Sequence, residues 1–125
     1  IDTPTGLAIS DGNLYATSRS EGKIYKIGND NQMLDDPIVV ADGLTDPEGL
    51  TIVGDEFVIV QGSDGKIVAT EMNGEGTTLA TISAGSDAAS ADQPPSMVFN
   101  GITAMPDGTL YATGETSRML YRLTR

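Results

Sequence analysis

The sequence contains no cysteine, no histidine and no tryptophan, and only 5% of its residues are aromatic. Without cysteine, the chain has no disulfide framework and no thiolate metal site. Without histidine, it lacks the usual general base and the commonest transition-metal ligand, so its serines have no evident base to activate them. No apolar run approaches the roughly 18 residues that indicate a transmembrane helix. We expect neither a membrane partner nor a signal peptide.

Basic residues are also scarce. Seven lysines and arginines stand against 18 aspartates and glutamates, which gives a formal net charge of −11. Such a charge repels phosphate backbones and anionic membranes. We therefore expect no nucleic-acid partner, whereas a hard cation is compatible with the charge. The acidic, cysteine-free composition is typical of bacterial extracellular or periplasmic proteins, and we expect that location.

The chain does contain an internal repeat. The segment TGLAISDGNLYATSRSEGKIYKI (5–27) is similar to EGLTIVGDEFVIVQGSDGKIVAT (48–70) and to NGITAMPDGTLYATGETSRMLYRL (100–123). The first two copies align without a gap, and the third needs one inserted residue near Pro106. Periods of about 40 to 50 residues indicate stacked supersecondary units. The sequence therefore predicts three equivalent units.

Each unit has the pattern of a β-meander. Stretches rich in β-formers, such as GLAIS, NLYATS and KIYKI, are separated by Asp-Gly and related pairs that are typical of tight hairpins. A fourth strand is predicted at 37–42 and at 77–83, and we interpret 28–37 as a hairpin connection. No helical period of adequate length is present. The sequence predicts an all-β fold of β-propeller blades: three four-stranded antiparallel meanders, of which the last lacks its outer strand.

We expect one propeller segment over residues 1–125, corresponding to half of a six-bladed ring. Blade 1 covers about 5–43, blade 2 about 48–83 and blade 3 about 98–125, with a polar loop at 84–96 that is either a lid or a tolerated insertion. Three blades form an arc, and its two end faces need cover. We expect either the remainder of a longer propeller chain or a second copy in a homodimer that closes the ring.

Two of the copies resemble known blade families. PTGLAISDGNLYATSRSEGKIYKI resembles an NHL repeat, and FNGITAMPDGTLYATGETSRMLYRL resembles a blade of the senescence-marker-protein/gluconolactonase family. The resemblance covers nearly the whole chain and implies a six-bladed propeller. It also implies calcium, held by acidic and asparagine residues that directly precede the inner-strand glycine. Glu48 and Asn100 are the metal ligands implied here, while Thr5 stands at the equivalent position and breaks the pattern.

The predicted topology gathers these positions at the mouth of the axial channel, because the strands of a meander alternate in direction. Carboxylate and amide oxygens are the ligands that calcium prefers, although Glu48 and Asn100 also suit turns. We interpret the four tyrosines as packing residues between blades rather than as a carbohydrate platform. The residues that we expect on this rim, besides the two metal ligands, are Thr5, Glu21, Asp46, Asp64 and Glu115.

Two functions remain open. The first is a binding or interaction module of the NHL or gluconolactonase-like type, which holds a small molecule, glycan or protein, with a divalent cation at the channel mouth. The second is a calcium-dependent lactonase or esterase-like hydrolase, completed by a second chain or by missing blades. No catalytic residue is assigned. The substitution at Thr5 and the incomplete ring favour the binding module.

Overall fold

The structure is a computed structural model of residues 1–125, and it describes all of them except 63–65, 73–79, 83–98, 115–118 and 124–125. Every regular element among the described residues is a β-strand, and none of these residues forms a helix that could cross a membrane. The strands are β1 (Pro4–Ser10), β2 (Asn13–Ser18), β3 (Lys23–Asn29), β4 (Gln32–Ala41), β5 (Pro47–Val53), β6 (Glu56–Gln61), β7 (Lys66–Glu71), β8 (Ala80–Ile82), β9 (Phe99–Ala104), β10 (Leu110–Gly114) and β11 (Met119–Leu123).

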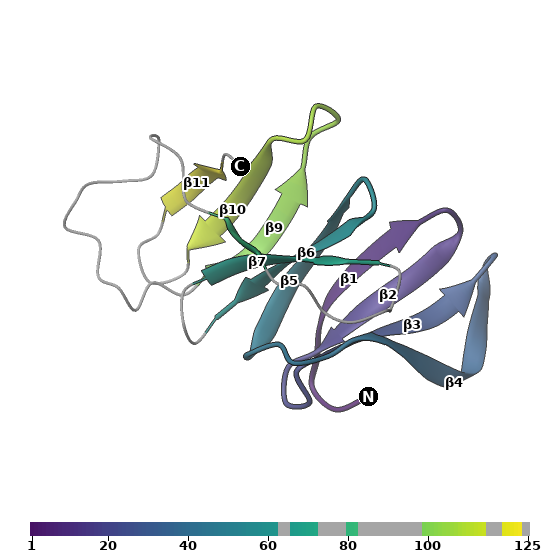
Figure 1. Ribbon diagram of the computed structural model, residues 1–125. Helices are drawn as coiled ribbons and strands as arrows, with labels where there is room; N and C mark the ends of the chain where they lie inside the picture. Colours follow the sequence, from purple (N-terminus) through teal and green to yellow (C-terminus); the bar gives the residue numbers. More distant parts are fainter. Residues whose placement is uncertain (63–65, 73–79, 83–98, 115–118, 124–125) are drawn as a thin grey trace.

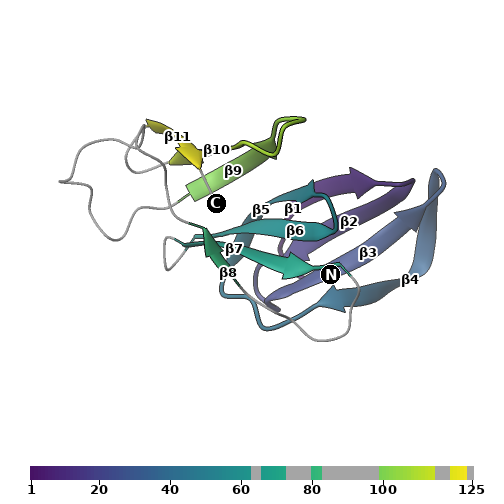
Figure 2. The same cartoon turned by 45° about the horizontal axis from the view of Figure 1, so that its top comes forward.

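The strands form three antiparallel sheets in chain order (Figure 1): β1 to β4, β5 to β8, and β9 to β11. We call these sheets blades 1, 2 and 3. The first strand of each blade contacts the first strand of the next, so β1, β5 and β9 lie side by side, as Figure 2 also shows. In the described residues the third blade has three strands. The predicted all-β fold of successive propeller-type meanders is confirmed.

Each of the three inner strands contains a β-bulge at the same point of the repeat. In every blade two residues of the inner strand oppose a single residue of the second strand. The bulged pairs are Thr5-Gly6, Glu48-Gly49 and Asn100-Gly101. The alignment of the repeats in sequence therefore holds in backbone register, and the inserted residue near Pro106 lengthens only the turn between β9 and β10.

Side-chain alternation gives each sheet two faces, and both are used for packing. We call the face that packs on the next blade the trailing face, and the opposite one the leading face. At the first junction, Tyr15 and Ile24 of blade 1 pack with Leu50, Phe57 and Ile59 of blade 2. The rings of Tyr15 and Phe57 meet edge to face, with centroids 5.0 Å apart and planes at 73°.

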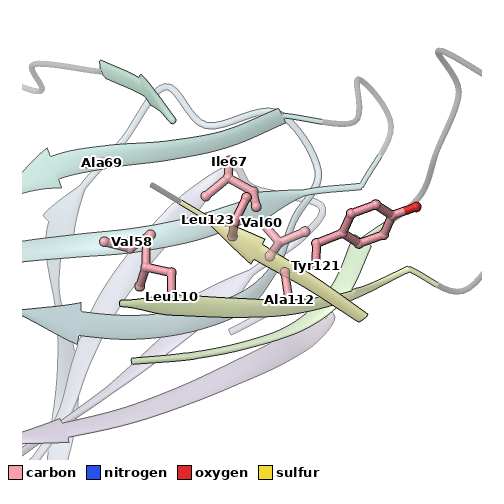
Figure 3. Packing of buried hydrophobic residues seen from close by; sticks show 8 residues of the cluster. All are labelled: Val58, Val60, Ile67, Ala69, Leu110, Ala112, Tyr121 and Leu123. Carbon is pink, nitrogen blue, oxygen red and sulfur yellow. The ribbon is translucent and has the colours of Figure 1, made fainter. Parts of the chain in front are cut away.

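The second junction has the same construction (Figure 3). Trailing-face residues of blade 2 interdigitate with leading-face residues of blade 3, and each of the eight side chains is at most 2% exposed. Burial of one such aliphatic side chain contributes about 1.5–3 kcal/mol. Both buried clusters of the described residues lie at these junctions, so the junctions supply most of the core. The cluster consists of Val58, Val60, Ile67, Ala69, Leu110, Ala112, Tyr121 and Leu123. The expected packing role of the tyrosines holds for Tyr15 and Tyr121.

The segment 28–37 differs from its prediction as a hairpin connection. β3 runs to Asn29 and β4 begins at Gln32, so the fourth strand starts well before residue 37. Only Asp30 and Asn31 form the turn, and both have positive φ, at 47° and 66°. Two-residue turns with positive φ at both positions match the twist of the flanking strands. The polar residues of this segment lie mainly on an exposed outer strand. The polar loop at 84–96 lies outside the described residues.

Candidate functional site

The start of the inner strands forms one edge of the arc, which we call the rim. The ends of β2 and β4 and the start of β3 lie at the same edge, because the strands of each blade alternate in direction. Backbone hydrogen bonds tie the connecting segments together there: Arg19 N donates to Thr3 O at 3.0 Å, and Leu44 N donates to Gly22 O at 3.0 Å. The rim therefore has an ordered backbone frame in blades 1 and 2.

The bulge of blade 1 is fastened to blade 2 by two threonine hydroxyls. Thr5 Oγ1 donates to Pro47 O at 2.8 Å, and Thr17 Oγ1 donates to Glu48 O at 2.9 Å. Thr17 is fully buried. A threonine in place of a carboxylate at position 5 therefore has a structural role, because its hydroxyl satisfies a backbone carbonyl of the next inner strand.

Glycine is required at Gly6 because the two inner strands approach closely. A Cβ at Gly6 would lie 2.3 Å from Glu48 O and 2.9 Å from Thr17 Oγ1. In blade 3 the equivalent position, Gly101, has only Thr113 Oγ1 within contact range, at 3.3 Å from such a Cβ. The same sequence position is therefore crowded where a next blade is present and open where none of the described residues follows.

The Glu48 side chain lies at the bulge of β5, where it faces the loop after β2. Its Oε1 is 3.5 Å from Nη1 of Arg19, and the two side chains are 15% and 47% exposed. A Cβ at Gly62 would lie 3.0 Å from the Glu48 carboxyl carbon and from Oε1, so a larger residue there would have to displace the carboxylate slightly. The Glu48 carboxylate thus lies between the Arg19 guanidinium and the backbone at Gly62. We call this arrangement the Arg19–Glu48 pair.

Glu21 is bound within blade 1. Its Oε2 accepts hydrogen bonds from Ser18 Oγ at 2.8 Å and from Asp2 N at 3.2 Å, and its Oε1 accepts one from the Tyr25 hydroxyl at 2.9 Å. These hydrogen bonds hold the pKa of Glu21 below its ordinary value, and the bond from Ser18 is the largest cause. The same carboxylate raises the pKa of Tyr25. Both oxygens of Glu21 are engaged, so it acts as an anchor for the N-terminal segment.

The other predicted rim residues are placed as follows. Asp46 is half-buried at the start of β5 with φ of 42°, and its carbonyl accepts a hydrogen bond from Gly62 N at 3.1 Å. Asn100 lies in β9 at the bulge that is equivalent to Glu48. Asp64 and Glu115 lie outside the described residues. The structure therefore brings Thr5, Glu48 and Asn100 to equivalent positions on neighbouring strands.

Arg19 and Thr17 are the rim residues that the sequence analysis missed. Arg19 is one of only seven basic residues in the chain. Its positive charge in an otherwise acidic rim loop is the feature of the sequence that could have identified it. Thr17 belongs to the repeated tetrapeptide Leu-Tyr-Ala-Thr, which also occurs at 110–113. Its role depends on contact with the next blade, which no local pattern reveals.

The donors of the described rim do not by themselves make a calcium site. Calcium takes six to eight oxygen ligands at about 2.3–2.6 Å. Within the described part of the chain, no three histidine, cysteine, aspartate or glutamate residues are grouped so that they could hold a metal. The Glu48 carboxylate already has the Arg19 guanidinium beside it, and a second cation there would be repelled.

One hollow lies at the opposite edge of the arc, between the hairpin tips of blades 2 and 3. Its volume is about 520 Å³, and its walls come from residues 52–54 and 104–108. Asp107 at its margin accepts a hydrogen bond from Thr109 N at 2.9 Å, which lowers the pKa of this carboxyl. That bond closes the turn, so this aspartate serves the hairpin.

Comparison with known proteins supports the fold. No family model matches the sequence, and no curated protein is similar to it. Among solved structures, the chain is similar to virginiamycin B lyase from Staphylococcus aureus, a β-propeller, with a TM-score of 0.66 and 20% sequence identity. The likeness covers 97% of this chain and 38% of that one. At this identity the likeness carries the fold and not the activity, and the chain is thus similar to a segment of a β-propeller.

Proposed function

We propose that this chain is part of a β-propeller binding module whose ligand sits on the rim, at the Arg19–Glu48 pair. One observation carries the proposal: an ion pair of unequal exposure, 47% for Arg19 and 15% for Glu48, stands at a bulge on a frame fixed by interblade hydrogen bonds. Bulges are over-represented next to functional sites, where they redirect a side chain.

The chemistry of the pair suits a polar, uncharged or zwitterionic ligand. A partly exposed ion pair adds only about 0–1 kcal/mol to stability, so stability alone gives little reason for it. The guanidinium presents several donors in a fixed plane, and the carboxylate presents acceptors. Donors and acceptors side by side match the hydroxyl groups of a glycan or the amides of a peptide.

Binding without catalysis fits the residues available. The sequence has no histidine, and among the described residues no cluster of candidate metal ligands accompanies Glu48. An extracellular or periplasmic location, where glycans and peptides are abundant, stays our expectation from composition.

The test is a glycan and peptide array probed with the wild-type chain and with Glu48→Gln, Arg19→Gln and Asp36→Asn. Asp36 is exposed on β4, so its variant removes one negative charge away from the rim. Virginiamycin B is included because the solved neighbour is a virginiamycin B lyase. We expect ligands that Asp36→Asn retains and the two rim variants lose. Ligands bound equally by all four proteins would refute the rim as the binding site.

A second candidate, a calcium-dependent lactonase-like hydrolase, rests on the equivalence of Glu48 and Asn100 at bulges of adjacent strands. Calorimetric titration with calcium chloride separates it from the binding module. The hydrolase requires saturable calcium binding that Glu48→Gln abolishes and Asp36→Asn preserves. No binding at millimolar calcium, or binding indifferent to Glu48, removes this candidate.

A further inference from the structure

The hollow at the edge of the arc opposite the rim combines apolar walls with negative charge. It lies between the β5–β6 turn (54–55) and the β9–β10 turn (105–109), which Figures 1 and 2 show on the same side of the molecule. Its volume of about 520 Å³ is within the range of about 300–1,000 Å³ that small-molecule sites occupy. Its two walls come from adjoining blades, so it lies within the arc and not at one of its ends.

The walls of the hollow are mainly apolar. Val53 and Ala104 are half-buried and pack against the cluster of the second junction, so this part of the wall continues into the core. Met105 is 49% exposed, and a thioether adapts to the shape of a ligand and contacts aromatic rings favourably. The apolar lining residues are Ile52, Val53, Ala104, Met105 and Pro106.

The β9–β10 turn is held in a fixed conformation. Met105 N donates to Thr109 O at 2.8 Å, and Gly108 N donates to Met105 O at 2.9 Å. Gly108 has φ of 90°, which favours glycine, and a Cβ there would lie 4.0 Å from Val53 Cγ1. The two turns therefore approach each other at Gly108 and Val53. A wall that is ordered before binding loses little conformational entropy when a ligand binds.

The hollow lies at a place where the repeats differ. The third copy has one inserted residue near Pro106, and five residues connect β9 to β10, whereas two connect β5 to β6. The longer connection brings Met105 and Pro106 to the hollow. This part of the apolar wall is therefore specific to the third repeat and is not required by the packing that all blades share.

Each of the two turns carries a carboxylate. Asp55 directly follows Gly54, and Asp107 stands at the margin of the hollow, and both aspartates are exposed. Neither turn contains a lysine or an arginine, and the whole chain has a formal net charge of −11. Asp107 accepts a hydrogen bond from Thr109 N, which uses one of the about four acceptor positions of a carboxylate. The charge at the hollow therefore favours a cation and disfavours an anion.

We propose that this hollow binds a small organic cation with an apolar body, namely a primary amine that carries an aromatic group. The aromatic group packs between Val53 and Met105, and the ammonium lies toward the carboxylates of Asp55 and Asp107. The site is at the opposite edge from the rim, so the proposal does not depend on the ligand proposed for the Arg19–Glu48 pair. It adds a second site, with different ligand chemistry, to the propeller segment.

The test is an NMR titration of the isotope-labelled chain with three compounds of the same length: phenylbutylammonium, phenylbutanol and phenylbutanoate. We expect phenylbutylammonium to bind saturably at millimolar concentration or below and to shift the backbone amides of the two turns. The alcohol lacks the charge and is expected to bind about two- to fivefold more weakly. The carboxylate is repelled and is expected to bind at least about tenfold more weakly.

Two substitutions test the contribution of charge. Asp55→Asn and Asp107→Asn remove one negative charge each, and the amide oxygen of asparagine can still accept the bond from Thr109 N. We expect each variant to bind phenylbutylammonium about two- to fivefold more weakly and phenylbutanol as before. Asp36→Asn, at an exposed aspartate of β4, is the matched control and should leave both affinities unchanged.

Met105→Ala tests the apolar wall. We expect it to weaken phenylbutylammonium and phenylbutanol about fivefold or more, because both lose the same apolar contact. Ile38→Ala shortens another half-exposed apolar side chain, on β4, and should change neither affinity. Thermal unfolding verifies that each variant keeps its fold.

The wild-type titration decides the proposal even where a variant fails to fold. The absence of saturable binding of phenylbutylammonium, or shifts confined to amides outside the two turns, would overturn it. Equal affinity for phenylbutylammonium and phenylbutanoate would also overturn it, since the carboxylates would then have no part in binding.

Discussion

At the scale of single residues, two threonine hydroxyls join the inner strands of blades 1 and 2. Thr5 and Thr17 donate to successive carbonyls of β5, those of Pro47 and Glu48, at 2.8 and 2.9 Å. Each bond satisfies a backbone acceptor beside a bulge, where the ladder of the sheet is interrupted. The hydroxyls therefore do at the rim what backbone amides do within a sheet.

Thr17→Val tests this role with little change of volume. The variant leaves Glu48 O without its donor in a buried place, so we expect a loss of about 1–3 kcal/mol in the free energy of unfolding. Urea denaturation measures it. Thr45→Val, at an exposed threonine of the same rim, is the control and should change stability by less than about 0.5 kcal/mol. Equal stability of the two variants would contradict the role of Thr17.

Glu21 allows a second prediction at this scale, because hydrogen bonds lower its pKa below the ordinary value of 4.5. A carboxyl with a depressed folded-state pKa contributes stability that is fully present above the unfolded value and disappears as the pH falls through the folded one. We expect Ser18→Ala to reduce this acid-dependent loss more than Tyr25→Phe does, since the Ser18 bond is the larger cause. Urea unfolding at a series of pH values, with carboxyl NMR of Glu21, checks the order. Identical acid profiles in the three proteins would count against the network.

At the scale of strands and turns, the repeats predicted much of the fold. Alignment of Gly6, Gly49 and Gly101 placed the inner strands, and Asp-Gly pairs placed the first hairpins, because both depend on local backbone preferences. The start of β4 was wrong, since the polar residues of 28–37 resemble a loop but lie on an exposed outer strand, whose position is decided by pairing with β3.

The candidate site, too, could be predicted from the sequence only in part. The positions of Thr5 and Glu48 on the rim followed from the repeat and the topology. The Arg19–Glu48 pair did not, because it joins the β2–β3 loop of one blade to the inner strand of the next. Contacts of this kind depend on how blades stack, and sequence periodicity carries no information on them.

The Asp30-Asn31 turn gives a test of the revised hairpin. Asn31 has φ of 66°, which asparagine tolerates and β-branched residues do not. We expect Asn31→Val to cost about 1–2 kcal/mol of unfolding free energy, whereas Gln32→Val, one residue later in β4, is close to neutral. Thermal or urea unfolding of both variants decides. If both substitutions are equally mild, the turn is not where the structure places it.

The bulge glycines give a test of blade stacking at the level of strands. Gly6→Ala pushes a methyl group against Glu48 O, and we expect it to cost about 1–3 kcal/mol. Gly101→Ala meets only Thr113 Oγ1 at 3.3 Å and should cost less than about 1 kcal/mol. Both are measured by urea unfolding. A larger cost at Gly101 than at Gly6 would contradict the close approach of β1 to β5 at Gly6.

At the scale of the whole molecule, the chain separates a repeated scaffold from positions where the repeats differ. Junction residues recur from blade to blade, as in the two Leu-Tyr-Ala-Thr segments, since each blade meets the same packing demand. The residues before the bulge glycines share a position and differ in chemistry: Thr5 fastens two blades, and Glu48 pairs with Arg19. We therefore propose that function belongs to the second group.

The role of the rim in binding is tested by calorimetric titration of the strongest array ligand into the wild type and into two variants that differ only in where a negative charge is lost. We predict that Asp36→Asn binds like the wild type, while Glu48→Gln binds at least about tenfold more weakly, a difference of about 1.4 kcal/mol. Equal affinity in Asp36→Asn and Glu48→Gln would contradict the assignment of the rim as the binding site.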